Sequence, residues 1–291
     1  MTRIAVVGAG AVGASVAAWL IAEPRHDVTL CTRTPFERLH VETPAGPLDS
    51  HPLVLTEPAD AQPVDWVIAA TKTYDAPGVS RWLERLADAG THVAILQNGV
   101  EHRSRFPQLD RARVVPVVVD IPAERHAPGM VVQRRTGSMT VPDDAAGRSF
   151  AALFAHSAIE LRLTDDWLTA AWAKLAVNCA GAINALTLRS AEIAHDEEAA
   201  ELMRALVREC VAVGRAEGAR LADTLPDDVV AGYRAAPGDS LNSIHADRLA
   251  GRQTEADARN GVIARLGERH GIDAPLNRMA ATLLKLGGPL P

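Results

Sequence analysis

The chain has 291 residues, of which 47% are hydrophobic and 23% charged, and its formal net charge is −6. This length favours two domains, and the composition is that of a globular protein with a substantial core. Because the balance is acidic and no long basic run occurs, the sequence argues against nucleic acid or an anionic membrane as a partner.

The first half of the chain alternates short apolar runs with helical stretches. Strands are predicted over residues 3–7, 27–32, 66–70, 92–96 and 114–119. Helices are predicted over 12–21 and around Val79, Leu83 and Leu86. This alternation indicates a parallel sheet covered on both faces. Three further strands, within 131–135, 138–141 and 159–163, are expected to form the far edge of the same sheet.

From residue 164 the strand signals stop and the pattern becomes helical. Helices are predicted over 167–182, 191–217, 227–235, 239–270 and 277–286. Proline and glycine residues separate these stretches. The change of pattern predicts a domain boundary between residues 1–164 and 165–291.

A G-x-G-x-x-G motif follows the first predicted strand and opens the first helix, over Gly8, Ala9, Gly10, Ala11, Val12 and Gly13. In dinucleotide-binding domains the three glycines allow a tight turn, close approach of a pyrophosphate, and close packing of helix on strand. The helix N-terminus then presents N–H groups to the phosphates. We therefore predict an α/β fold, with an N-terminal Rossmann-type doubly wound sheet followed by an all-α C-terminal domain. The alternative is a tight βα turn with no ligand.

The end of the second predicted strand indicates which dinucleotide binds. An NAD site carries Asp or Glu about 20 residues past the glycines, to bind the ribose 2′-hydroxyl. Here that interval falls on Cys31, Thr32 and Arg33, and the next carboxylate after Arg33 is Glu37. A guanidinium can bind a 2′-phosphate, so Arg33 favours NADP(H), unless it is an ordinary surface arginine.

Several further segments, in order and with matching spacing, resemble the ketopantoate reductase (2-dehydropantoate 2-reductase) family. They are Lys72–Tyr74 (KTY), Gln97–Gly99 (QNG), Trp172–Asn178 (WAKLAVN), Asn184–Thr187 (NALT), Ser243–Gly261 ending in GRQTEADARNG, and Gly271–Asn277 (GIDAPLN). The resemblance spans nearly the whole chain. It implies an enzyme that reduces a 2-keto acid, 2-dehydropantoate above all, by hydride transfer from NADPH.

Lys72 and Asn98 follow successive strands, at the sheet edge where open α/β sheets bind ligands. Taken alone, Lys72 could be a solvated loop residue and Asn98 a turn former. The resemblance favours cofactor contacts for both, as it does for Ala123 in the loop after the strand at 114–119.

Lys174 lies in an apolar helical stretch, with Asn178 four residues on and therefore on the same face. A lysine that faces a cleft can protonate a carbonyl oxygen as hydride reaches carbon, whereas the alternative is a lysine that extends to solvent. The resemblance implies Lys174 as proton donor, with Lys174, Asn178, Asn184 and Ser243 as substrate ligands. It also implies that Glu255 contacts cofactor or substrate at the catalytic centre.

Some positions depart from the family pattern. Asn184 lies two residues further from Asn178 than in relatives with N-x-x-x-N. Glu101 and His102 follow the QNG segment, and Glu124 lies in the loop that carries Ala123. A carboxylate near an anionic keto acid would weaken its binding, so Glu101 and Glu124 leave the substrate open.

Two alternatives therefore accompany the keto-acid reductase. The same fold could reduce another carbonyl or an imine, or it could serve as a non-catalytic NADP-binding sensor, although Lys174 and Glu255 argue against a sensor. The expected partner is a small-molecule substrate, and the helical domain is compatible with a homodimer.

The remaining signals concern compartment and metals. Cys31, Cys179 and Cys210 show no C-x-x-C pairing, which is typical of free thiols in a reducing compartment. We find no signal peptide and no apolar run near the ~20 residues that span a bilayer, so we expect a cytoplasmic protein. The ten histidines lack metal-ligand spacing, and no metal site is predicted.

Overall fold

A computed structural model describes residues 1–288. Its contacts divide the chain into two compact units. The sheet unit consists of Met1–Gln97 with Glu101–Trp167, and the helical unit of Asn98–Val100 with the chain from Leu168 onward. The predicted boundary between residues 164 and 165 stays a prediction, and in the structure the units part between Trp167 and Leu168.

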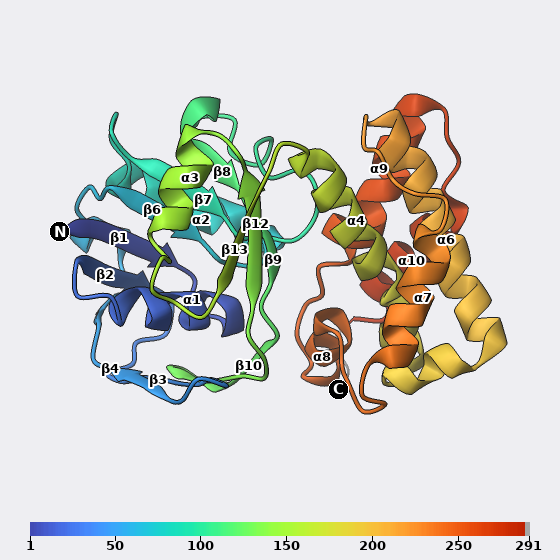
Figure 1. Cartoon of the computed structure of the whole chain (residues 1–291), viewed down its shortest axis with the longest axis horizontal. Coiled ribbons are helices and arrows are strands. Elements are labelled where there is room, and N and C mark those ends of the chain that lie inside the picture. The colour runs from blue at the N-terminus through green and yellow to red at the C-terminus, as the bar shows by residue number, and fades with distance from the viewer. Residues whose placement is uncertain (289–291) are drawn as a thin grey trace. The chain divides into compact units, whose positions relative to one another are not determined.

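Six parallel strands form the central sheet of the sheet unit, in the order β5-β2-β1-β6-β7-β8 (Figure 1). They are β1 (Thr2–Val7), β2 (His26–Cys31), β5 (Leu53–Leu55), β6 (Trp66–Ala69), β7 (His92–Ile95) and β8 (Val114–Pro116). Successive residues of β1 enter different cores, because side chains alternate between the faces of a strand. Ile4 and Val6 pack in the core that contains α1 (Ala11–Ile21), whereas Ala5 and Val7 pack in the core that contains α2 (Ala76–Leu86). The sheet is therefore covered on both faces, which confirms the doubly wound fold.

Two smaller sheets complete this unit, and they correct the prediction that residues 131–163 extend the central sheet. One has the order β10-β11-β3-β4 and the other β13-β12-β9. Their strands are β3 (Leu39–Glu42), β4 (Leu48–Ser50), β9 (Val118–Asp120), β10 (Ala123–Ala127), β11 (Met130–Gln133), β12 (Ser138–Pro142) and β13 (Glu160–Thr164). The strand expected over 114–119 is divided between two sheets, β8 in one and β9 in another. Pro116 lies at the division, where it has no N–H to donate to a ladder.

Helix α3 (Ala145–Ala152), between β12 and β13, was not predicted. It begins at Asp144, whose carboxylate accepts a hydrogen bond from the backbone N–H of Gly147. This is the usual N-terminal cap of a helix. Phe150 is fully buried and joins the same core as α1.

The helical unit consists of helices with connecting loops over the residues that the structure describes, which confirms the all-α prediction. Its α-helices are α4 (Trp167–Ala180), which starts at the last residue of the sheet unit, α5 (Ala182–Thr187), α6 (Glu197–Ala216), α7 (Leu225–Ala235), α8 (Ser243–Leu249), α9 (Val262–His270) and α10 (Pro275–Leu286). The unit also contains two short helices of other types. They are η4 (Ala191–His195), a 3-10 helix, and η5 (Asp257–Gly261), a π-helix that leads directly into α9.

The single helix predicted over 239–270 was wrong. Helix α8 ends at Leu249, and a loop precedes η5 and α9. Gly251 adopts a φ of +63°, which a helix cannot continue through. Between residues 1 and 288, no helix is long and apolar enough to cross a membrane.

Candidate active site

The glycine turn after β1 is built so that side chains are excluded at two of its three glycines. Gly8 has a φ of +101°, and a Cβ there would lie 2.8 Å from the Thr71 side chain. At Gly13 a Cβ would lie 1.9 Å from the carbonyl oxygen of Gly8. Gly10 differs, because a Cβ there would meet nothing within 4 Å. Gly8 and Gly13 are thus required by the fold itself, whereas the space beside Gly10 is open.

Helix α1 starts immediately after Gly10, and no side chain caps it. The first N–H groups of a helix have no partner within the helix and carry a partial positive charge. An open approach at Gly10, together with this uncapped N-terminus, fits the pyrophosphate of a dinucleotide.

Arg33 lies beyond the end of β2, with its side chain 87% exposed. Its Nη2 lies 3.4 Å from a carboxylate oxygen of Asp75. Asp75 lies in the turn after β6, which is far from Arg33 in the sequence. The sequence around Arg33 therefore gives no indication of this carboxylate. Asp75 is therefore a site residue that sequence reasoning missed. Such an exposed pair contributes only about 0–1 kcal/mol, so it leaves Arg33 available to a phosphate.

Lys72 lies just past β6, in a segment that is held by the buried amide of Gln97. The Gln97 Nε2 donates to Thr71 Oγ1 at 3.0 Å and to the Lys72 carbonyl at 3.4 Å. Arg105 in turn donates to Gln97 Oε1 at 3.4 Å. The first residue of the QNG segment thus positions the backbone that carries Lys72.

Asn98, Glu255 and Asn178 meet in the helical unit, to which Asn98–Val100 belong by their contacts. Asn98 Nδ2 donates to a carboxylate oxygen of Glu255 at 2.9 Å, and Asn178 Nδ2 donates to Asn98 Oδ1 at 3.4 Å. Glu255 is only 4% exposed. The structure thus brings together three predicted site residues from three distant parts of the sequence.

Lys174 and Asn178 both lie on α4, one turn apart, and both are partly buried. The helix is anchored by Trp172, which is fully buried against α6. Its ring packs on Gly214 of α6 so closely that a Cβ at Gly214 would lie 2.9 Å from the ring. This anchor positions the turn that presents Lys174.

Ser243 is the first residue of α8, and its Oγ accepts a hydrogen bond from Arg259 Nη2 at 2.5 Å. Arg259 was not among the predicted site residues. Its place in the TEADARNG segment gave no signal, because an arginine in a helical stretch is usually solvated.

Asn184 is buried, and its side chain closes the turn that follows α5. Its Nδ2 donates to the carbonyls of Arg189 and Ser190, at 3.0 and 2.8 Å, and its Oδ1 accepts from Asn242. These bonds occupy the amide, so its role as a substrate ligand stays a prediction.

Ala123 begins β10 and pairs with Gln133 of β11. The neighbouring carboxylate of Glu124 forms an ion pair with Arg134 at 2.5 Å, and Asp120 pairs with Arg135 at 3.0 Å. Glu124, whose charge was a concern for an anionic substrate, therefore has a cation beside it, from the residue that follows β11.

His102, in the segment after QNG, is 2% exposed, and neither ring nitrogen forms a hydrogen bond of good geometry with a described residue. Its ring meets Trp167 edge-on, with centroids 5.1 Å apart. Burial first, and then the nearby charge of Arg105, lower the pKa of His102 to about 3. It is therefore a neutral packing residue at ordinary pH.

Other residues of the family-like segments hold the helical unit together. Asn260 donates to the Cys179 carbonyl at 3.1 Å and to Asn277 Oδ1 at 2.9 Å. Asp247 pairs with Arg252 at 3.0 Å. The bonds of Asn260 connect η5 to α4 and α10, which is a structural role for this position of the motif.

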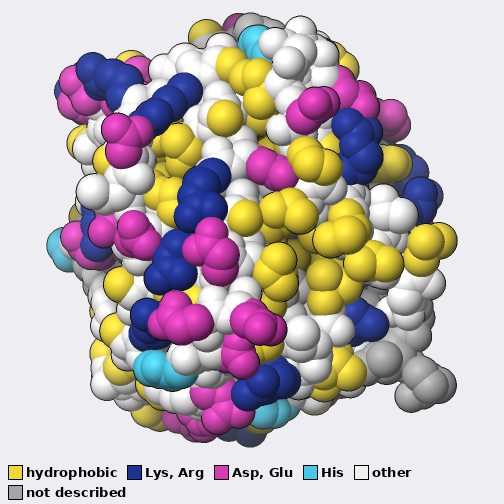
Figure 2. Space-filling view, turned by 90° about the vertical axis from the view of Figure 1, so that its right-hand side faces the viewer, with side chains coloured by type: hydrophobic (Ala, Val, Ile, Leu, Met, Phe, Trp, Pro, Cys, Tyr) yellow, Lys and Arg dark blue, Asp and Glu magenta, His cyan; other side chains and the backbone are white. Residues whose placement is uncertain are grey.

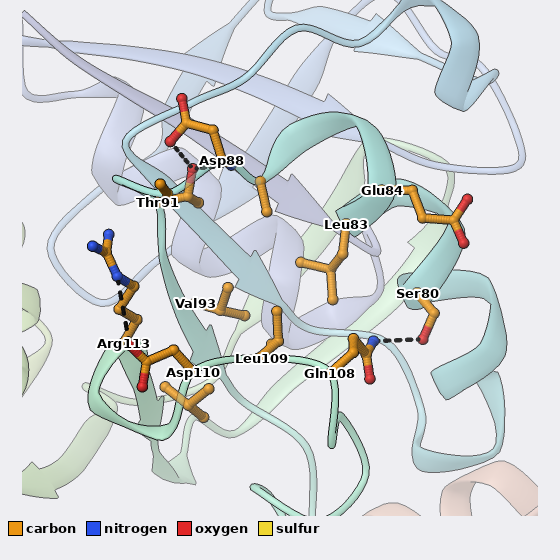
Figure 3. A pocket seen from close by; sticks show the side chains of 13 residues that line it. Ser80, Leu83, Glu84, Asp88, Thr91, Val93, Gln108, Leu109, Asp110 and Arg113 are labelled. Atoms are coloured by element: carbon orange, nitrogen blue, oxygen red, sulfur yellow. Dashed lines mark hydrogen bonds and ion pairs between the residues drawn. The ribbon is translucent and has the colours of Figure 1, made fainter.

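A hollow of about 730 Å³ lies elsewhere in the sheet unit (Figure 3). Its walls come from α2, from the start of β7 at Thr91 and Val93, and from the loop that leads into β8 at Arg113. It therefore lies at the amino ends of the strands, whereas open α/β sheets bind cofactors at the carboxyl ends. None of the predicted site residues lines it.

The doubly wound sheet, its glycine turn and the attached helical unit define the class of dinucleotide-binding oxidoreductases. Two family descriptions match the chain: "Ketopantoate reductase PanE/ApbA" over residues 4–146 and "Ketopantoate reductase PanE/ApbA C terminal" over 166–287. The chain is 60% identical to a 2-dehydropantoate 2-reductase of Caulobacter vibrioides, with 98% of each chain covered. It is 39% identical to one of Mycobacterium tuberculosis, with 97% of each covered. The chain belongs to the ketopantoate reductase family.

Solved structures agree with this assignment. A 2-dehydropantoate 2-reductase from Geobacter metallireducens has a TM-score of 0.91 at 28% identity, over 98% of this chain and 99% of the other. A dimeric ketopantoate reductase from Staphylococcus aureus has a TM-score of 0.88 at 27% identity, over 98% of each chain.

Proposed function

We propose that this protein reduces 2-dehydropantoate to pantoate with NADPH, with Lys174 as the proton donor. The observation that carries the proposal is the cluster of Asn98, Asn178 and Glu255, which lies one helical turn from Lys174. The names of the relatives support the substrate.

The residues of the glycine turn would hold the cofactor. The backbone at Gly10 and the start of α1 receive the pyrophosphate, and Arg33 receives the 2′-phosphate. When bound, NADPH supplies the hydride that reduces the carbonyl carbon. We assign Lys72 and Ala123 to the cofactor on the family resemblance.

Lys174 donates a proton to the carbonyl oxygen, and its positive charge stabilises the alkoxide that develops there. Asn178 contributes an amide group that orients the substrate, whereas we assign Asn98, like Lys72, to the cofactor on the family resemblance. Glu255 places a carboxylate beside Asn98 and fixes the direction in which that amide points. One hydride and one proton are added, so the ketone becomes a secondary alcohol and needs no further reactant.

The proposal is tested by initial rates of NADPH oxidation with 2-dehydropantoate and with 2-ketoisovalerate, which lacks the hydroxymethyl group. A site that bonds a hydroxyl rejects the analogue without it, because its own polar groups are left unpaired. We expect 2-dehydropantoate to be favoured more than about tenfold in kcat/KM.

Equal rates with the two acids would mean that the fold serves another carbonyl or an imine. Cofactor binding without turnover of any substrate in a panel of keto acids would favour a sensor. Both results contradict the proposed reaction.

A second copy of the chain is the partner that we propose for the helical unit. Met279, Leu283 and Leu286 are exposed along α10 at helical spacing, at 51%, 46% and 77%. Hydrophobic side chains also gather in a patch on the face of this unit that Figure 2 shows. The dimeric relative from Staphylococcus aureus supports a homodimer. Light scattering after gel filtration tests it: we expect twice the monomer mass, and a shift to monomer in Leu283→Glu.

A further inference from the structure

Arg259 is a buried arginine whose charge has no balancing carboxylate in the part of the chain that the structure describes. It lies in η5, is 2% exposed, and forms no ion pair among residues 1–288. Within the described part of the chain it forms one hydrogen bond, from Nη2 to Ser243 Oγ, and its buried Nε has no partner there.

The two titratable groups described near Arg259, Tyr233 and Glu255, form no ion pair with it. Burial raises the pKa of the Tyr233 hydroxyl to about 12 despite the nearby Arg259 charge, and this hydroxyl donates to the Val177 carbonyl. Glu255, four residues earlier, accepts from Asn98 and forms no ion pair with Arg259. A guanidinium stays charged at every physiological pH, and burying such a charge alone costs several kcal/mol. Among residues 1–288 no carboxylate lies within ion-pair distance of Arg259 to offset that cost, so an added anion would be stabilised there.

Ser243 contributes a second donor of the same kind. Its oxygen accepts from Arg259, and its own O–H, on an exposed side chain, forms no hydrogen bond with a described residue and can donate to a ligand. The N–H groups of Arg259 and the O–H of Ser243 thus form a set of donors. An ionised carboxylate is an acceptor-only group, and it fits such a set.

We propose that Arg259 and Ser243 bind the carboxylate of the keto-acid substrate. This inference rests on the proposed function and deepens it, because it gives the positive charges of Arg259 and Lys174 different roles. Arg259 recognises the carboxylate in the ground state, and Lys174 acts on the carbonyl oxygen. It also explains why an arginine is buried beside the serine that the family resemblance assigns to the substrate.

The test compares an acid with a neutral form of the same molecule. KM and kcat are measured for 2-dehydropantoate and for its methyl ester, in the unmodified protein and in Arg259→Gln and Arg259→Lys. In Arg259→Gln we expect KM for the acid to rise about tenfold to a hundredfold, the range for a charge-assisted hydrogen bond. KM for the ester and Kd for NADPH should stay within about twofold. Arg259→Lys, which keeps the charge without the planar fork, should fall between.

A purely structural arginine would affect acid and ester alike, so an equal rise for both overturns the proposal, as does an unchanged KM for the acid. Should the Arg259 variants not fold, Ser243→Ala tests the same subsite, and it should raise KM for the acid only.

The proposed function can fail separately. In that case the unmodified protein does not reduce 2-dehydropantoate, and the subsite is tested by calorimetric binding of pivalate, a simple carboxylate. Binding that is lost in Arg259→Gln supports the subsite, and equal or absent binding in both proteins overturns it.

Discussion

Asn98 donates a hydrogen bond to the buried carboxylate of Glu255 over 2.9 Å, although 157 residues separate them in the chain. A buried carboxylate needs such donors, because an unpaired buried charge is costly. The bond also fixes the Asn98 amide so that its oxygen faces Asn178. The three side chains are therefore linked by two consecutive hydrogen bonds.

We expect Asn98→Ala and Glu255→Gln to be coupled. Residues that share a hydrogen bond show interaction free energies of about 0.5–3 kcal/mol in double-mutant cycles. The cycle is measured on kcat/KM, with Asn98→Ala and the exposed Glu192→Gln as the control pair. Additive effects for Asn98 and Glu255 would show that the bond does not contribute to the reaction.

Lys174→Ala is expected to lower kcat about 10²–10⁴-fold, because general acid catalysis contributes that much. NADPH binding should survive, since the glycine turn belongs to the sheet unit. Lys285→Ala, a change of the exposed lysine on α10, serves as control and should leave kcat unchanged. A Lys174→Ala enzyme that folds and retains about a third or more of the parent rate removes this residue from the mechanism.

Arg33→Ala should weaken NADPH binding about tenfold to a hundredfold and leave NADH binding nearly unchanged. Asp75→Asn should act in the opposite direction and strengthen NADPH binding by up to about fivefold, because it removes the exposed ion pair that competes for Arg33. Fluorescence titration with both cofactors measures this, and Arg81→Ala is the control. Equal Kd values for NADH and NADPH in the parent would contradict the assignment of Arg33.

Two glycines of the turn should respond differently to alanine. Gly13→Ala places a Cβ 1.9 Å from the Gly8 carbonyl, so it should lower the melting temperature as well as abolish cofactor binding. Gly10→Ala meets no protein atom within 4 Å, so the fold should tolerate it while Kd for NADPH rises about tenfold or more. Gly78→Ala, equally unobstructed in α2, is the control for both measurements. Cofactor affinity unchanged in Gly10→Ala would place the pyrophosphate elsewhere.

Because the pKa of His102 is lowered by burial, we expect the free energy of unfolding to depend on pH. Its pKa is about 3 in the folded protein, against about 6.5 for an unperturbed histidine. Below pH ~6.5 the unfolded state binds a proton that the folded state does not, so stability is lost as pH falls toward 3, by up to about 1.4 kcal/mol per pH unit.

His102→Phe should remove this contribution and flatten the melting temperature between pH 6 and 4 relative to the parent, whereas the exposed His126→Phe should not. Parallel pH profiles for His102→Phe and the parent would mean that the ring titrates normally in the folded protein.

The central sheet could be predicted because each of its long strands is a continuous apolar run bounded by turn residues. The strands between Leu39 and Leu55 were missed, since each has only three or four residues and prolines interrupt the pattern. The same limit applies to residues 131–163, where the runs predict strands correctly but not which sheet they join. Which strand pairs with which depends on residues far along the chain, and the alternation of apolar and polar residues within one strand does not specify them.

For the site, the sequence by itself determined the features that depend on local spacing. Gly8 and Gly13 follow from the steric limits of one turn, and Lys174 and Asn178 share a face because they lie four residues apart on one helix. Only the tertiary structure decided that Asn98 meets Glu255, that Asp75 lies beside Arg33, and that Arg259 is buried against Ser243 with no ion pair to another described residue. The physical reason is that burial and charge pairing are properties of the surroundings of a side chain, and those surroundings come from segments that the fold brings together.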